Sequence, residues 1–167
     1  MESIKLSEKE ETNASIIVGQ LFLNFGNLEY IAFLLLHEFG NKTQRERVFK
    51  MKISERIRDI QTIAHHLKIS QEKQQCIIDV FKELKKLSQT RNTVAHGPFL
   101  IKGDKQGFMD LQRSKGQVPG SVTLITLAGI HKVNLQLVAL YEKILPVIQE
   151  LMPSPSSTLI VNQTKQS

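Results

Sequence analysis

The sequence has very little cysteine and no tryptophan. Cys76 is the one cysteine among 167 residues, so no disulfide can form within the chain, and a reducing, cytoplasmic setting is expected. Aromatic residues make up 6%, which means that the core must be mostly aliphatic. With 41% hydrophobic residues, the chain has enough apolar side chains for one globular domain.

The sequence also lacks an unbroken run of about 18 apolar residues, the length that a membrane span requires. Asn24, Asn27 and Glu29 interrupt the most apolar region, residues 15–36. We therefore interpret this region as a buried helix and expect no membrane partner. The first residues, MESIKLSEKEE, are acidic and polar, unlike a secretory or transit signal.

The patterns of common cofactor and metal sites are missing as well. The glycines of KGDKQG lack the spacing of a phosphate-binding loop and predict a turn instead. His65 and His66 are adjacent and diverge around a helix, so they make a poor metal pair. Cys76 has no histidine near it in the sequence and is expected in the core. The sequence predicts neither a cofactor nor a metal.

Positive charge is in excess and unevenly distributed. The chain has 22 Lys and Arg against 16 Asp and Glu, a formal net charge of +6. Between Lys42 and Lys73 there are nine basic and four acidic residues, and Lys82, Lys85 and Lys86 follow. A basic region of this kind permits an anionic partner, and we take these last three lysines as candidate RNA-binding residues. The alternative is a solvated helix face without a partner.

The longest periodic segment predicts a first helix from about residue 8 to Phe39. Ser7 and Glu10 have the spacing of a capping box at its start, and Gly40 and Asn41 are expected to end it as left-handed residues. Its apolar residues cover much more than one stripe, so the helix must be covered on more than one side. The cover is either the rest of the domain or a second copy of the chain.

Three further helices are predicted by apolar spacing and by caps. The second helix begins at Ser54, and the third follows Ser70 as its N-cap. The last helix follows Thr126 and continues through Leu151, with Pro146 expected to kink or split it.

Between the third and last helices the sequence changes to short β-prone runs. FLI and FMDLQ flank the turn KGDKQG and predict a small hairpin, and a third short strand is expected at SVTLIT. The predicted fold is therefore all-α, a bundle of four to five helices with a small β-hairpin insertion between the third and last long helices. Residues 1–152 form a single domain, and residues 153–167 are predicted to be a disordered C-terminal tail.

The end of the third helix carries an unusual set of polar residues, in the stretch TRNTVAHGPF. At about 100° per residue, Arg91 falls within about 20° of Leu84, in the centre of the apolar stripe. A buried arginine stays charged and needs an anionic partner or a wet cavity. One interpretation pairs Arg91 with Glu29, which lies among apolar neighbours on the first helix. The other interpretation places Arg91 in a pocket that binds a phosphate.

Asn92 and His96 are four residues apart on the same helix, so they share a face and can converge on one ligand. His96 in the last turn also complements the helix dipole, and Gly97 and Pro98 end the helix. These helix-ending roles account for His96, Gly97 and Pro98. They do not account for an arginine on the apolar stripe.

The stretch RNTVAHG resembles the signature of the HEPN superfamily, an arginine, usually followed by asparagine, with a histidine four to six residues after the arginine. The stretch GNLEYIAFLLL in the first helix is similar as well, and the resemblance covers about residues 10–150. The resemblance implies a helical bundle, usually a homodimer, whose active members cleave RNA without a metal in a cleft shared by two subunits. It makes Arg91 and His96 catalytic, with Asn92 in support and Glu29 as a carboxylate lining the site.

The function implied by this resemblance is a metal-independent endoribonuclease that acts as a homodimer, in a toxin or host-defence setting. RNA is then the expected substrate, and a cognate antitoxin is an expected partner. The alternative is a non-catalytic HEPN-like dimer that binds a nucleotide, RNA or a protein. A third interpretation is a structural module in which Glu29 neutralises Arg91. Some family toxins carry a modified tyrosine two residues after the histidine, but Pro98 stands there in this chain, so that regulation is not expected.

Overall fold

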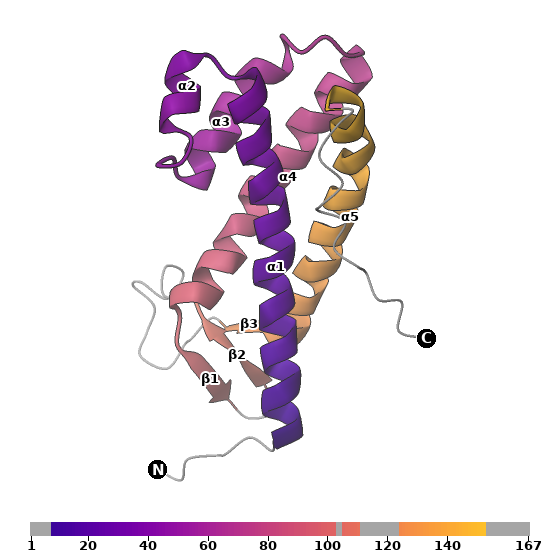
Figure 1. Cartoon of the computed structure of the whole chain (residues 1–167). Helices are drawn as coiled ribbons and strands as arrows, with labels where there is room; N and C mark the ends of the chain where they lie inside the picture. The colour runs from indigo at the N-terminus through magenta and orange to yellow at the C-terminus, as the bar shows by residue number, and fades with distance from the viewer. Residues whose placement is uncertain (1–7, 103–104, 111–123, 153–167) are drawn as a thin grey trace.

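The computed structural model describes residues 8–102, 105–110 and 124–152. These residues form five helices and a three-stranded sheet (Figure 1). The elements are, in order, α1 (Glu8–Phe39), α2 (Lys42–Arg47), α3 (Ile53–Ala64), α4 (Gln71–His96), β1 (Phe99–Lys102), β2 (Lys105–Met109), β3 (Leu124–Thr126) and α5 (Leu127–Leu151). The fold is thus mainly helical, as predicted, with the strands between α4 and α5. The predicted tail, residues 153–167, lies outside the described residues.

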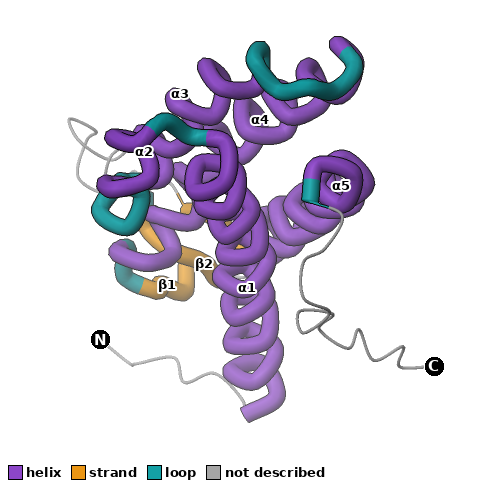
Figure 2. The backbone as a smooth tube through the Cα atoms, turned by 45° about the horizontal axis from the view of Figure 1, so that its top comes forward, coloured by secondary structure: helices purple, strands orange, loops and turns teal. Residues whose placement is uncertain are grey.

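Helix α1 is the element against which α3, α4 and α5 pack, and Figures 1 and 2 show it running the length of the molecule. Its bounds agree with the prediction, although Ser7 of the expected capping box lies outside the described residues. One side of α1 belongs to the core, with Leu21, Leu28 and Leu35 fully buried. By length and hydropathy alone α1 could also cross a membrane, and 28% of its most apolar window is buried within the fold.

The end of α1 differs from the prediction. Asn41 is extended, with φ −68° and ψ 171°, and it is the N-cap of α2, a short helix that the sequence analysis missed. Its Oδ1 accepts from the Gln44 backbone N–H at 3.0 Å, and the Gln44 side chain accepts from the Asn41 N–H at 2.9 Å, which completes a capping box. Gly40 is required for space rather than for a left-handed turn, because a Cβ there would lie 2.2 Å from the Leu36 carbonyl oxygen.

Helices α4 and α5 begin at the caps predicted from the sequence. Ser70 caps α4 and Thr126 caps α5, each side chain accepting a backbone N–H of the first turn, and α3 begins at Ile53, one residue before the predicted start. Pro146 lies inside α5, which continues on both sides of it, so the helix is not split. Asn134 of α5 is buried and donates from Nδ2 to the Ile17 carbonyl oxygen of α1 at 2.9 Å.

The three strands form an antiparallel sheet in the order β1-β2-β3. Phe99 pairs with Phe108 and Phe108 with Ile125, and the Phe99 and Phe108 rings meet edge to face at 5.2 Å. The predicted hairpin is therefore present. Its second strand spans residues 105–109, earlier than the predicted FMDLQ, because pairing begins next to the turn. The sheet lies at the end of α4 that carries the RNTVAHG stretch (Figure 1).

Candidate functional site

Arg91 lies where α4 packs against α1. It is half-buried in the apolar stripe between Leu87 and Val94, which are 8% and 5% exposed. Its guanidinium carbon is 5.8 Å from the ring centroid of Phe22 and 5.8 Å from that of Phe25, both on α1. The predicted orientation toward the apolar side is thus confirmed. Two cation–π contacts hold the planar head against α1.

The ion pair between Arg91 and Glu29, one of the two interpretations of this arginine, is not formed. Glu29 is half-buried on α1, one turn beyond Phe25, and no carboxylate of the described residues makes an ion pair with Arg91. The polar contact of the guanidinium is with its neighbour, since Nη1 donates to Asn92 Oδ1 at 3.2 Å. The interpretation of the chain as a structural module, in which Glu29 neutralises Arg91, therefore lacks the ion pair that it requires. Aromatic rings take its place, and they leave the positive charge unneutralised.

His96 is the last residue of α4, and its side chain is exposed, as is that of Asn92. Gly97 ends the helix in an extended conformation, with φ −85° and ψ 143°. A Cβ at this position would lie 2.4 Å from the Met109 carbonyl oxygen and 2.6 Å from that of Thr93. Glycine is thus needed because β2 passes very close to the helix end. The imidazole is left at the surface, where α4 meets the sheet.

Asp110 is a residue near the motif that the sequence analysis missed. It directly follows Met109, whose carbonyl oxygen faces Gly97, and it is 1% exposed. A carboxylate is thereby buried close to the end of α4. In the sequence, Asp110 is simply an acidic residue inside the β-prone run FMDLQ. An acidic residue is equally common in a strand that faces water, so its burial could not be predicted.

The candidate RNA-binding lysines do not lie on the same face of α4 as Arg91. Lys82, Lys85 and Lys86 are exposed, and Lys86 forms an ion pair with Glu83 at 2.7 Å. At about 100° per residue, the three lysines lie about 120–180° around α4 from Arg91. They form a separate positive face of the same helix.

Other side chains with potential chemistry lie away from this motif. Cys76 is half-buried, its Sγ is 3.8 Å from the Lys143 carbonyl oxygen, and burial raises the pKa of its thiol. An open cavity of about 610 Å³ is lined by residues such as Phe39, Leu67 and Leu151, near the C-terminal ends of α1 and α5. Within the described ranges, no three His, Cys, Asp or Glu side chains are grouped as metal ligands would be.

Comparison with protein-family models, with curated proteins and with solved structures finds no match to this chain. The site is therefore defined by its own geometry. It consists of a half-buried arginine on an aromatic pair, an adjacent asparagine, and an exposed histidine at the end of the same helix.

Proposed function

We propose that this chain is a metal-independent endoribonuclease of the HEPN type, which acts as a homodimer with a composite active site. The observation that carries the proposal is Arg91, a half-buried guanidinium that makes no ion pair with the described part of the chain. A partly desolvated arginine is a strong binder of phosphate, because its planar fork can donate two parallel hydrogen bonds. A backbone phosphate of RNA is the anion that we assign to it.

The chemistry fits the side chains at the end of α4. Attack of a ribose 2′-oxygen on the adjacent phosphorus forms a P–O bond and breaks the bond to the 5′-oxygen, which leaves a 2′,3′-cyclic phosphate and a 5′-hydroxyl. A base must take the proton of the 2′-hydroxyl, and an acid must give one to the departing 5′-oxygen. One His96 cannot lie on both sides of the phosphorus, but His96 from each of two copies can. Arg91 stabilises the negative charge of the phosphorane, and Asn92 orients the guanidinium.

An open face of α1 supports the homodimer. Ile16 and Leu23 are 53% and 70% exposed, and added Cβ atoms at Gly19 and Gly26 would meet nothing within 4 Å. At about 100° per residue these four residues fall within an arc of about 80°. We call them the α1 seam. Large apolar residues that alternate with glycines suit the close approach of a second helix.

The seam borders the motif. Phe22, which contacts Arg91, lies beside Gly19 and Gly26 on α1 and is 37% exposed. A second copy that packs antiparallel on the seam, about a two-fold axis perpendicular to α1, would bring its own Arg91 and His96 to the same edge of the pair. The proposed dimer thus explains both the uncovered apolar face and how two motifs can share one phosphate.

The dimer is tested by charging the seam. Leu23→Glu is expected to convert a dimer to a monomer in sedimentation velocity without loss of helix content, because the side chain is exposed in the single chain. Leu135→Glu on α5 is the matched control, since Leu135 is also apolar and 59% exposed. A wild-type monomer at micromolar concentration, or binding to lipid vesicles that Leu23→Glu abolishes, would overturn the seam as a dimer contact.

The activity is tested with purified protein and structured RNA in EDTA. Cleavage should leave cyclic phosphate ends, and Arg91→Ala and His96→Ala should each abolish it while circular dichroism shows an intact fold. Leu23→Glu should lose activity together with dimerisation. Intact tRNA and mRNA at high enzyme concentration would reject the nuclease and leave a binding module.

A non-catalytic HEPN-like dimer is the second candidate, and one observation favours it. The Arg91 head is already engaged by two rings and by Asn92 Oδ1, an arrangement that can hold a bound anion without acting on it. Such a module would bind a nucleotide, RNA or a protein partner through the same face. For the nuclease, we place the activity in the cytoplasm, in a toxin or defence setting in which an antitoxin would cover the motif.

A further inference from the structure

An aromatic cluster lies on the surface where α1 meets the loop between α2 and α3. The Phe33 ring lies 6.1 Å from that of Tyr30 and 5.6 Å from that of His37, and it contacts the Phe49 ring at 4.9 Å between centroids. Phe49 is 73% exposed and Tyr30 is 44% exposed. Large parts of these rings therefore face water. We call the four residues the aromatic cluster.

Phe49 is held in this exposed position by residues on both sides of it. Val48 is fully buried and Met51 is 8% exposed, so the loop is fixed to the core just before and just after Phe49. Arg56 of α3 donates from Nε to the Val48 carbonyl oxygen at 3.2 Å. The ring is thus presented to solvent by an anchored backbone, and not by a loose loop. An exposed aromatic surface on a fixed scaffold is typical of a binding site.

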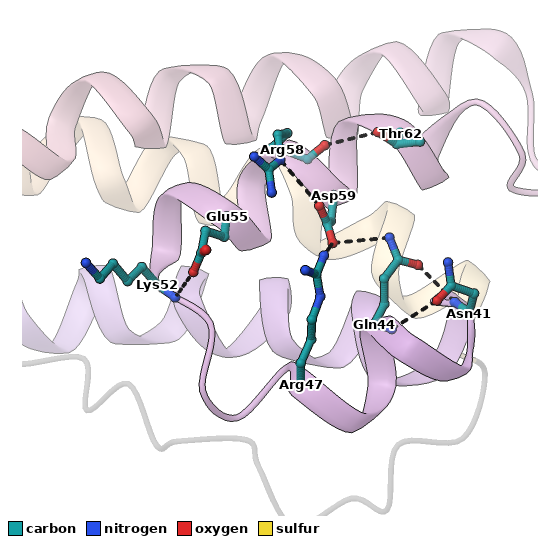
Figure 3. A network of polar contacts seen from close by, with 8 residues as sticks. All are labelled: Asn41, Gln44, Arg47, Lys52, Glu55, Arg58, Asp59 and Thr62. Carbon is teal, nitrogen blue, oxygen red and sulfur yellow. Dashed lines mark hydrogen bonds and ion pairs between the residues drawn. The ribbon is translucent and has the colours of Figure 1, made fainter.

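The helices on either side of this loop are also tied together, as Figure 3 shows. The Asp59 carboxylate of α3 is buried and accepts from Arg47 Nη2 at 2.5 Å and from Gln44 Nε2 at 3.3 Å, both on α2. Arg58 Nε lies 3.6 Å from the other carboxylate oxygen. This network fixes α2 on α3, and with it the position of Phe49 relative to α1.

The segment that carries Phe49 is positively charged. Residues 42–58 contain seven Lys or Arg and two Glu, a net charge of +5. Asp59 engages two of the arginines, but Arg45, Lys50 and Lys52 are exposed and make no ion pair with any residue that the structure describes. Lys50 and Lys52 follow Phe49 directly in the loop. Flat apolar rings next to unpaired cations suit a ligand that offers both stacking faces and negative charge.

We propose that the aromatic cluster, together with Lys50 and Lys52, binds single-stranded RNA. Unpaired bases would stack on Phe49 and Tyr30, and the adjoining phosphates would contact the two lysines, the combination by which proteins hold single strands. The shared chemistry of bases and phosphates would also admit single-stranded DNA, and the preference for RNA rests on the proposed function. A duplex, whose bases are already stacked, is a poor fit.

The cluster is placed to hold a strand whose other end reaches the motif. Arg91 contacts α1 at Phe22 and Phe25, of which Phe22 is the exposed ring. At 1.5 Å and 100° per residue, Tyr30 lies about 12 Å further along α1 than Phe22 and about 80° around the helix from it. A strand that joins the two would therefore extend over more than one nucleotide and pass partly around α1. The cluster would thereby select unpaired segments and position them for the motif.

The test measures binding of a 3′-fluorescein-labelled oligouridylate of about 12 nucleotides by fluorescence anisotropy. His96→Ala is used as the background, so that no RNA is cut, and EDTA is present. Phe49→Ala is expected to weaken binding about five- to hundredfold, the effect of losing one stacked base. Phe49→Tyr should keep the affinity, because the ring remains. The matched control is Leu135→Ala, an exposed apolar residue of α5, which should leave the affinity within about twofold.

The charges are tested by a pair of variants that lose the same number of lysines. Lys50→Gln with Lys52→Gln should weaken binding and reduce its dependence on salt by about 1.4 in the slope of log K against log salt. Lys132→Gln with Lys143→Gln, two exposed lysines of α5, should do neither. Equal affinities of the two double variants would overturn the proposal.

Further outcomes separate this proposal from the proposed function. Phe49-dependent binding by a protein that never cuts RNA would support the cluster and reject the nuclease. Normal cleavage by Phe49→Ala, together with an affinity in the His96→Ala background that the Phe49 change leaves unaltered, would do the reverse. The same measurement with an oligothymidylate shows whether the site also binds single-stranded DNA. Binding of both strands assigns the site to single strands in general, binding of RNA alone assigns it to RNA, and either result supports the proposal. Tighter binding of a duplex, or a Phe49→Ala variant that changes only the self-association, would overturn it.

Discussion

Replacement of Arg91 by alanine tests how this guanidinium is satisfied. Its contacts are two cation–π interactions, at 5.8 Å from Phe22 and 5.8 Å from Phe25, and a hydrogen bond to the exposed Asn92. At about 0.5–1 kcal/mol for each ring, the variant should lose about 1–2 kcal/mol of unfolding free energy. A buried ion pair would give a much larger loss, about 3–5 kcal/mol, because a carboxylate would be left alone in the core.

The free energy of unfolding is measured by urea titration, followed by circular dichroism of the helices, and RNA cleavage is measured on the same preparations. Arg91→Ala should reduce cleavage by about a hundredfold or more, since it removes the charge that stabilises the phosphorane. Arg91→Lys should be nearly as stable but poorly active, because an ammonium cannot donate two parallel hydrogen bonds. Lys132→Ala, which removes an exposed positive charge on α5, is the control for both measurements.

Two results would refute this account of Arg91. A loss of about 3 kcal/mol or more would mean that Arg91 has a buried anionic partner in the folded protein. Cleavage at the wild-type rate by Arg91→Ala would mean that the phosphate is held elsewhere. Loss of cleavage together with a loss of only about 1–2 kcal/mol is the combination expected if Arg91 acts on the phosphate and has no buried anionic partner.

Other predictions concern stability and thiol reactivity. Gly97→Ala should lower the unfolding free energy by about 1–3 kcal/mol in urea, because its Cβ would lie 2.4 Å from the Met109 carbonyl oxygen, and an unchanged midpoint would contradict this packing. Asp59→Ala should cost about 2–3 kcal/mol in a thermal melt, since buried Gln44 loses its acceptor, and a melting temperature equal to that of wild type would show that the network is dispensable. Burial raises the pKa of Cys76, so iodoacetamide should alkylate it more slowly at neutral pH than a free thiol, with a rate that keeps rising at alkaline pH, as mass spectrometry can follow. Alkylation as fast as that of glutathione would show that the thiol is exposed.

The helices were predicted well because their signals are local. The bounds of α1, the caps Ser70 and Thr126 and the end of α4 at His96 depend on residues within one or two turns of each end. The same kind of signal was misread at Asn41, which can end one helix or begin the next. Only its hydrogen bonds with Gln44 show that it begins α2.

The candidate site could be predicted in part. Helical periodicity alone places Arg91 on the apolar face of α4, and the structure agrees. The partner of Arg91 could not be derived in this way, because it depends on how far α4 is shifted along α1. The shift places Phe22 and Phe25 next to the guanidinium and leaves Glu29 without an ion pair to it.

The aromatic cluster and the burial of Asp110 could not be predicted from the sequence for the same reason. Phe33 and Phe49 are sixteen residues apart and meet where the loop between α2 and α3 packs against α1. Asp110 is buried because β2 passes the end of α4. The ends of most helices and the direction in which Arg91 faces can be read from the sequence, since helical backbone geometry repeats every few residues. The contacts of each of these side chains cannot be read in this way, because contacts between distant segments depend on how whole helices pack against one another.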